Sequence, residues 1–186
     1  RIHQSDRPDD EVCLLFGRNP GRMEKVRGDV LEANSATPSR LTVCDAPLDL
    51  DSITPQMREN LDDELTEVKS ENAIDRITSQ ANPRTLERVP AGARFHVRFV
   101  VDILCEEDKV LPALLVEGLR LLEDDSLGGG GSRGSGRVRF AKLRLTWRGR
   151  SFYASGAPET EHLAGAGLAE VQSLMSDSEF PAKLAE

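Results

Sequence analysis

The chain has 186 residues, a formal net charge of −8, and 38% hydrophobic but only 4% aromatic residues. That length suits one domain of about 100 to 200 residues that carries an insertion. No apolar run reaches the roughly 18 residues that cross a bilayer and no signal peptide is apparent, so we expect a soluble protein of the cytoplasm that does not enter a membrane. Cys13, Cys44 and Cys105 form no C-x-x-C pair, which argues against a zinc ribbon or a disulfide framework.

The first residues contain no clear start of a folded element. The sequence begins with Arg1 rather than Met, and residues 13–17, "CLLFG", are too short for a central strand. We therefore expect a strand and a helix upstream of residue 1. The first predicted strand is "RLTVCDA", residues 40–46, a short apolar run that follows a turn-rich stretch.

A second strand is predicted at residues 94–104, "RFHVRFVVDIL". Alternate residues of this run are apolar and would share one half-buried face. These residues are Phe95, Val97, Phe99, Val101 and Ile103. His96 falls on the opposite, polar face, so we expect a surface imidazole there rather than a catalytic one.

Helical spacing of apolar residues follows in "VLPALLVEGLRLLEDD", residues 110–125, with Pro112 suited to the first turn. The predicted helix ends at a run of glycines. Beyond the glycines, residues 137–147 alternate as in a strand. The alternation slips at Ala141 and Lys142, which is typical of a β-bulge.

The glycine-rich stretch "LLEDDSLGGGGSRGSGRVRF", residues 121–140, has the G-x-G-x-x-G spacing at Gly129, Gly131 and Gly134. A dinucleotide site needs a buried strand before such glycines and a helix after them. Here the predicted helix comes first and the strand second. A P-loop would need lysine after its last glycine, whereas Ser135 follows here. Both nucleotide interpretations are therefore disfavoured.

Charge is segregated along the sequence. Residues 45–75 are rich in acids, whereas residues 126–150 contain no acid and seven basic residues. These are Arg133, Arg137, Arg139, Lys142, Arg144, Arg148 and Arg150. Local basic density favours binding of a polyanion, because phosphate contacts act over a Debye length of about 10 Å. The alternative is that these side chains form only the solvated face of a strand.

Residues 65–92 separate the first two predicted strands, and an insertion of this length usually has a function. Apolar and cationic residues are interleaved in it, which favours an ordered arm. An apolar tip between cationic sides could wedge between stacked bases while its arginines hold phosphates. The alternative is a surface hairpin that only pads the domain. The order strand, strand, helix, strand suggests a ferredoxin-like sheet with an empty central slot.

Three stretches together resemble a known family: "RLTVCDA", "TEVKSENAIDRITSQANPRTLERVPAG" and "LLEDDSLGGGGSRGSGRVRF". In this order and spacing they are similar to the repeated backbone subunit of type III-A CRISPR (Csm) effector complexes, a member of the RAMP superfamily. The likeness covers roughly residues 13–145.

The resemblance implies an α+β fold, with an RRM-like (ferredoxin-like) antiparallel sheet and helices on one face. Residues 1–150 would form this domain without its N-terminal part, and residues 65–92 would be its inserted thumb β-hairpin. Residues 151–186 look like an acidic C-terminal tail with a weak helix around residues 162–175.

The resemblance also implies the RNA contacts. The loop would approach the RNA backbone through glycines and neighbouring arginines, namely Gly128, Gly129, Gly131, Arg133, Gly134, Gly136 and Arg137. The thumb would contribute the cations Lys69, Arg76, Arg84 and Arg88, with Ile74 and Ile77 near its tip. The expected partners are a CRISPR RNA, a target RNA, further copies of the chain in a filament, and other subunits of the complex.

Members of this family cleave target RNA in a metal-dependent reaction, so the resemblance implies Mg²⁺ or another divalent cation as cofactor. Their essential aspartate lies in a loop near the N-terminus, and we expect it upstream of residue 1, so that this fragment alone could be inactive. Asp45, Glu67, Glu71 and Glu87 match acidic positions of the family, and we expect each to fix an arginine or the arm rather than to bind metal. Cys13 alone cannot make a metal site.

Two other functions stay open. The chain could be a purely architectural RNA-binding subunit without nuclease activity. It could also be a RAMP endoribonuclease that processes precursor CRISPR RNA, although such an enzyme should lack the arm.

Overall fold

The structure is a computed structural model that describes residues 10–17, 38–62, 65–177 and 180. The chain forms two compact units. The core unit comprises residues 1–42 and 101–186, and the arm unit comprises residues 43–100. No helix in the described parts is long and apolar enough to cross a membrane.

The core unit is a mixture of helices with one strand pair. Its elements are α1 (Glu11–Phe16), the 3-10 helix η2 (Glu106–Val110), α3 (Leu111–Asp124), η3 (Gly131–Arg133), β7 (Leu143–Trp147), α4 (Arg150–Ser155), β8 (Thr160–Ala166) and α5 (Leu168–Met175). β7 and β8 pair antiparallel, with register shifts between Leu143 and Thr146. The helix predicted before the glycines is confirmed as α3, and Pro112 lies in its first turn.

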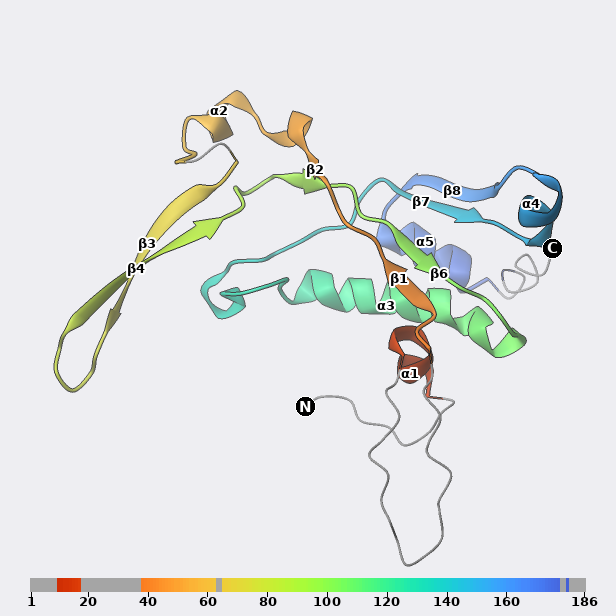
Figure 1. Cartoon of the computed structure of the whole chain (residues 1–186), viewed down its shortest axis with the longest axis horizontal. Coiled ribbons are helices and arrows are strands. Elements are labelled where there is room, and N and C mark those ends of the chain that lie inside the picture. Colours follow the sequence, from red (N-terminus) through yellow and green to blue (C-terminus); the bar gives the residue numbers. More distant parts are fainter. Residues whose placement is uncertain (1–9, 18–37, 63–64, 178–179, 181–186) are drawn as a thin grey trace, which may run out of the picture. The chain divides into compact units, whose positions relative to one another are not determined.

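The hydrophobic cluster of the core unit joins α3, β8 and α5. Its buried members are Val116, Ala166, Leu168 and Val171. Phe140 and Leu143 follow the glycines in the sequence and flank the expected bulge. Both pack against this cluster. Figure 1 shows α5 lying alongside α3, and the side chain of Arg120 on α3 donates a hydrogen bond to Gln172 on α5.

The segment expected as an acidic tail is therefore largely part of the fold. β8 and α5 supply Ala166, Leu168 and Val171 to the cluster, and the N–H of Gly167 donates to Glu170 Oε2 at 2.9 Å where α5 begins. Within the expected weak helix, residues 162–166 are strand and only Leu168–Met175 is helix. The physical reason is pairing, because β7 needs a neighbour for its backbone groups and β8 provides it.

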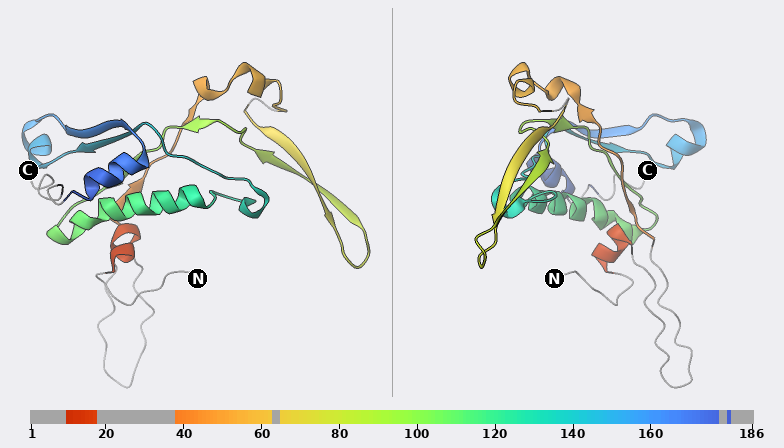
Figure 2. Two further views of the ribbon diagram at one scale, coloured as in Figure 1. Left: turned by 180° about the vertical axis from the view of Figure 1, so that it is seen from behind. Right: turned by 60° about the vertical axis from the view of Figure 1, so that its left-hand side comes forward.

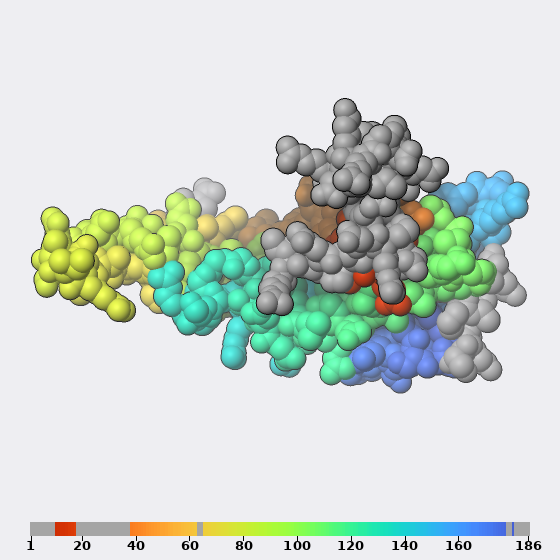
Figure 3. All heavy atoms as spheres, turned by 90° about the horizontal axis from the view of Figure 1, so that it is seen from below, coloured from red at the N-terminus to blue at the C-terminus, as the bar shows by residue number. Residues whose placement is uncertain are grey.

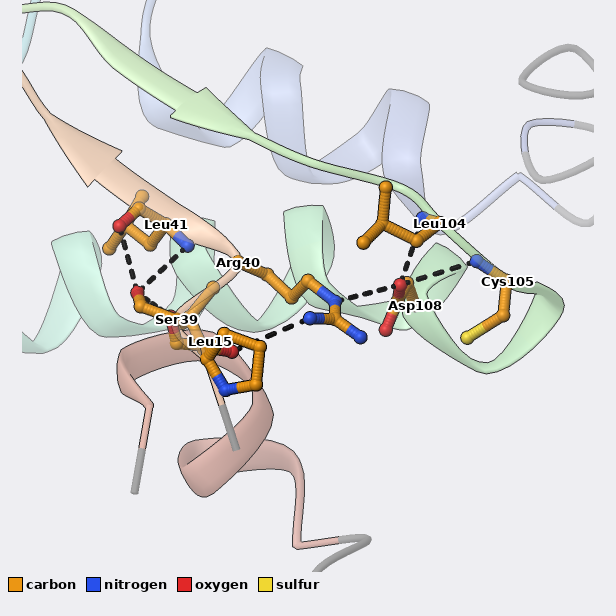
Figure 4. A network of polar contacts seen from close by, with 8 residues as sticks. Leu15, Ser39, Arg40, Leu41, Leu104, Cys105 and Asp108 are labelled. Carbon is orange, nitrogen blue, oxygen red and sulfur yellow. Dashed lines mark hydrogen bonds and ion pairs between the residues drawn. The ribbon is translucent and has the colours of Figure 1, made fainter. Parts of the chain in front are cut away.

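A buried polar network fixes the start of β1 (Leu41–Val43) to the core unit (Figure 4). The carboxylate of Asp108 is fully buried and accepts hydrogen bonds from Arg40 Nε at 3.1 Å and from the N–H of Leu104 at 2.9 Å. Burial raises the pKa of Asp108, but the N–H of Leu104 and the guanidinium of Arg40 outweigh it, and the pKa lies below its usual value. Ser39 Oγ donates to the carbonyl of Leu15, which ties α1 to the same place.

The arm unit is a long two-stranded ribbon with a short helical insertion. Its elements are β2 (Leu48–Asp49), the 3-10 helix η1 (Leu50–Ser52), α2 (Pro55–Arg58), β3 (Glu67–Ile74), β4 (Ala81–Arg88) and β5 (Arg94–Phe95). β3 and β4 form an antiparallel hairpin, which Figure 2 shows as a twisted ribbon. The expected arm at residues 65–92 is thus a β-hairpin.

The predicted strand at residues 94–104 is present only in two pieces, β5 and β6 (Phe99–Val101). β6 pairs with β1, and β5 pairs with β2. Between the pairs, Pro47 lies opposite His96 and has no N–H to donate, so the regular ladder is interrupted there. Phe95 and Val97 are 45% and 43% exposed, so the expected half-buried face is wrong for this part of the run. His96 is exposed, as predicted.

An α+β fold with small antiparallel sheets is confirmed. The described strands form four two-stranded sheets, with the pairs β1–β6, β2–β5, β3–β4 and β7–β8. The expected single sheet, in which these strands would be neighbours, does not form within the described residues.

Candidate nucleic-acid interface

The β3–β4 hairpin has two chemically different faces. The register places Glu67 opposite Arg88 and Glu71 opposite Arg84, with Lys69 between them on the same face because side chains alternate along a strand. The other face carries Glu87 as its one charge, and its remaining members are small, neutral or aliphatic: Val68, Ser70, Asn72, Ile74, Ala81, Pro83 and Thr85. One face of the arm is therefore ionic and the other nearly uncharged.

Cross-strand ion pairs hold two of the arm's predicted RNA-binding cations. Arg84 Nη2 lies 2.9 Å from Glu71 Oε2, and Arg88 Nη2 lies 3.7 Å from Glu67 Oε2. Both pairs are partly exposed, so each contributes only about 0 to 1 kcal/mol to stability. The expectation that Glu67 and Glu71 fix arginines agrees with this geometry, whereas Glu87 lies on the other face and Asp45 lies outside the hairpin.

The tip of the arm is a turn organised by Asp75. Asp75 Oδ1 accepts hydrogen bonds from the N–H groups of Ile77 and Thr78, both at 2.8 Å, and the N–H of Ser79 donates to the carbonyl of Asp75. The hydrogen bonds from Thr78 and then Ile77 lower the pKa of Asp75 below its usual value. The turn holds Ile77 94% exposed at the end of the arm. A large apolar side chain is thus presented to solvent on an ordered turn.

Ile74 and Arg76 flank this tip. Ile74 is the last residue of β3 and is 65% exposed, and Arg76 begins the turn with an exposed side chain. Lys69 lies halfway along the ionic face and is also exposed. The predicted tip and side positions are therefore all at the surface of the hairpin.

The glycine-rich loop of the core unit is closed by one backbone hydrogen bond. The N–H of Leu127 donates to the carbonyl of Gly136 at 2.8 Å, and the carbonyl of Gly130 accepts from Arg133 and Ser135. Gly128, Gly130, Gly134 and Gly136 all have positive φ. Figure 3 shows atoms of the teal segment that contains this loop uncovered on that face of the molecule. The loop is a compact, ordered turn at the surface.

Gly136 and Gly129 differ in whether the fold of the loop requires glycine at their positions. A Cβ on Gly136, where φ is +81°, would lie 2.2 Å from the carbonyl oxygen of Leu127, so the closed loop itself needs glycine there. Gly129 has neither a positive φ nor any atom within 4 Å of a Cβ placed on it. The fold of the described chain therefore gives no reason for glycine at position 129, and the backbone there is open to close approach by a ligand.

The resemblance implies that all these residues contact RNA, and the structure divides them between the two units. Lys69, Ile74, Arg76, Ile77, Arg84 and Arg88 belong to the arm unit, and Gly128, Gly129, Gly131, Arg133, Gly134, Gly136 and Arg137 belong to the core unit. Within each unit the predicted residues are close in the fold.

A divalent metal does not fit the described residues. Among residues 10–17, 38–62, 65–177 and 180, no group of three or more His, Cys, Asp or Glu side chains could hold a metal ion. Asp108 accepts hydrogen bonds from Arg40 and two backbone N–H groups through Oδ2 alone, and its buried Oδ1 has no hydrogen-bond partner. The sequence did not single it out because the run "CEEDK" looks like ordinary surface.

A model of the RAMP superfamily matches residues 2–139. This match includes β1, the hairpin arm, α3 and the glycine-rich loop, and the chain belongs to the RAMP superfamily.

Curated relatives carry a more specific name. The chain is 37% identical over 147 residues to "CRISPR system Cms endoribonuclease Csm3" of Methanocaldococcus jannaschii, a match that covers 77% of this chain and 52% of that protein. It is 34% identical over 146 residues to the Csm3 of Enterococcus italicus, covering 75% of this chain and 58% of the relative. Over 84 residues, which are 44% of this chain and 38% of the relative, it is 46% identical to the Csm3 of Streptococcus thermophilus. The chain spans about half the length of the relatives that it matches over most of its own length.

Proposed function

We propose that the chain is part of a guide-RNA-binding backbone subunit of a type III-A CRISPR effector complex. The observation that carries this proposal is the ordered hairpin arm with Ile77 presented at its tip, in a RAMP chain whose relatives are named Csm3. In this role the arm inserts its apolar tip into an RNA duplex and displaces a nucleotide. The open backbone at Gly129 lets the core unit approach the guide closely.

The proposed partners are a CRISPR RNA, a target RNA, further copies of the same subunit stacked along the guide, and the other subunits of the complex. RNA retention would depend on cations that are exposed in the two units, such as Lys69 and Arg76 in the arm and Arg137 beside the loop. Phosphate contacts of this kind make binding weaker as salt rises, because each contact releases counterions from the RNA.

The finer fold that we propose is an RRM-like sheet. Residues 137–140 alternate between exposed and half-buried positions, as in a strand, yet they belong to none of the described strand pairs. A strand from another part of the whole subunit would pair with this edge.

Target cleavage at regular intervals is proposed for the whole subunit, with a divalent cation such as Mg²⁺ as cofactor. The described residues do not provide a metal site, so the catalytic carboxylate would lie elsewhere in the whole subunit. A purely architectural subunit is the second candidate, and this lack of a carboxylate cluster is the observation that favours it. The precursor-processing candidate is disfavoured by the arm, which such an enzyme should lack.

The test is an assembled complex that contains the full-length subunit and a guide RNA. Addition of a matched target RNA with Mg²⁺ should give evenly spaced fragments, and EDTA should abolish them. Intact target under conditions of full binding would support the architectural candidate, and failure to bind guide RNA would overturn both.

A matched pair of variants tests the arm. Ile77→Ser removes the apolar tip, whereas Val68→Ser removes an aliphatic side chain that is 40% exposed at the base of the arm. We expect Ile77→Ser to disturb the fragment pattern and Val68→Ser to leave it unchanged. Equal behaviour of the two variants would contradict a special role of the tip.

A further inference from the structure

Four cations follow the glycine-rich loop on the exposed side of one segment. They are Arg137, Arg139, Lys142 and Arg144, and we call them the basic row. Their side chains are exposed, whereas three of the residues between them, Val138, Phe140 and Leu143, are half-buried. Phe140 and Leu143 pack on the core cluster, so the inward side of the segment is fixed by hydrophobic contact.

Lys142 keeps the basic row on one side. Strict alternation from Phe140 would turn residue 142 toward the core and Leu143 toward solvent. Lys142 instead has a φ of +55°, and the resulting shift places Leu143 and Leu145 inward and Arg144 outward. The register of β7 against β8 is irregular just beyond this residue.

A lysine with positive φ is costly, since this backbone region favours glycine. In the described chain the non-glycine residues with positive φ are Ser79, in the turn of the arm, and Lys142. Glycine would relieve the strain at position 142, but it would also remove a cation from the basic row. The strained position thus combines the break in the alternation with a charge.

The basic row ends at Arg144, because the next cation is already neutralised. Arg148 Nε lies 2.9 Å from Glu159 Oε2, and its guanidinium lies 5.0 Å from the ring centre of Phe152. Arg148 therefore differs from the basic row in its partners, although it directly follows the last residue of β7.

We propose that the basic row binds consecutive phosphates of one RNA strand, as a continuation of the contact made by the glycine-rich loop. Arg137 and Arg139 are two residues apart, as are Lys142 and Arg144. In an extended chain this separation is about 6.6 Å, a spacing that successive phosphates of an extended single strand can match. Figure 1 shows the segment leaving the loop as an extended trace before β7. The inference deepens the proposed function and depends on it, because it takes RNA as the ligand.

The test is binding of a fluorescent single-stranded RNA by the full-length subunit at increasing KCl concentrations. Each lost phosphate contact should lower the slope of log affinity against log salt by about 0.7. The triple variant Arg139→Gln, Lys142→Gln and Arg144→Gln should therefore lower the slope by about 2. The matched control Arg148→Gln should leave it unchanged, and thermal melting checks that each variant is folded.

A second pair tests the positive φ at Lys142. Lys142→Gly and Lys142→Val remove the same cation, but only valine opposes a positive φ. We expect Lys142→Val to bind RNA more weakly than Lys142→Gly, because Arg144 beyond it is displaced. Equal affinity of these two variants would overturn the role of this backbone conformation.

The outcomes separate the two proposals. A wild-type subunit that binds no RNA overturns the proposed function and the basic row with it. A wild-type subunit that binds RNA with the same salt slope as the triple variant overturns the basic row alone. If the triple variant keeps the slope but no longer assembles with other subunits, the row contacts an acidic protein surface instead, which also overturns the inference.

Discussion

Arg84 and Glu71 face each other directly across the hairpin arm, with Arg84 Nη2 and Glu71 Oε2 2.9 Å apart. The side chain of Arg84 is about half exposed, at 51%, so it is accessible and paired at the same time. RNA phosphate would therefore compete with Glu71 for this cation.

Glu71→Gln should strengthen RNA binding. The substitution removes the competing carboxylate and leaves Arg84 able to contact phosphate, which should steepen the salt dependence by about 0.7 in slope. Stability should change by less than about 1 kcal/mol, as for other exposed ion pairs. Salt titrations of RNA binding measure the first effect and chemical denaturation the second. Weaker binding by Glu71→Gln would show that the carboxylate itself is needed at the interface.

The glycine-rich loop gives opposite predictions at two positions. Gly129→Ala should fold normally, since a Cβ there meets nothing within 4 Å, but it should weaken RNA binding by about tenfold if one hydrogen bond to a charged phosphate is lost. Gly136→Ala should destabilise the protein by about 1 to 3 kcal/mol through its positive φ and the contact with Leu127. Thermal melting and RNA binding together distinguish the two effects. Unchanged RNA affinity in Gly129→Ala would mean that the backbone at 129 does not approach the ligand.

Asp108 should be among the most sensitive residues of the core unit. Asp108→Ala leaves the partly buried Arg40 side chain and the N–H of Leu104 without their acceptor, and we expect a loss of about 3 to 5 kcal/mol in the free energy of unfolding. Chemical denaturation measures it. A loss below about 1 kcal/mol would contradict the network in Figure 4.

The same carboxylate predicts an acid dependence. Because the pKa of Asp108 is lowered in the folded protein, its contribution is complete above the unfolded value of about 3.9 and is lost as the pH falls through the lower folded pKa. The stability difference between wild type and Asp108→Asn should therefore shrink below about pH 4. Denaturation curves at several pH values measure this difference, and a difference that grows on acidification would contradict the sign.

Leu168 tests whether α5 belongs to the core. It is 5% exposed within the cluster, so Leu168→Ala should cost about 2 to 5 kcal/mol. Leu121→Ala, at a position that is 64% exposed on α3, is the control and should stay within about 0.5 kcal/mol of wild type. Similar unfolding curves for the two variants would mean that α5 does not contribute to stability.

Several elements could be predicted from the sequence because local pattern and final packing agree. α3 has apolar residues at helical spacing with Pro112 at its start, and the slip at Lys142 coincides with its positive φ. The hairpin arm was expected from the family resemblance, and it lies within the predicted range.

Other elements depend on tertiary contacts that no local pattern reveals. β8, "TEHLAGA", has little of the alternation or β-branched content of a strand, and it becomes one because β7 lies beside it. Phe95 and Val97 alternate correctly, but Pro47 opposite His96, between them, interrupts the ladder. The RNA contacts themselves stay predictions, since they depend on a partner.

The two ends of the arm unit lie side by side, because the N–H of Cys44 donates to the carbonyl of Arg98 at 3.0 Å. An insertion whose two ends already touch can be lengthened, shortened or exchanged without pulling the host scaffold open. The length of the arm could therefore differ among related chains while the supporting core stays the same.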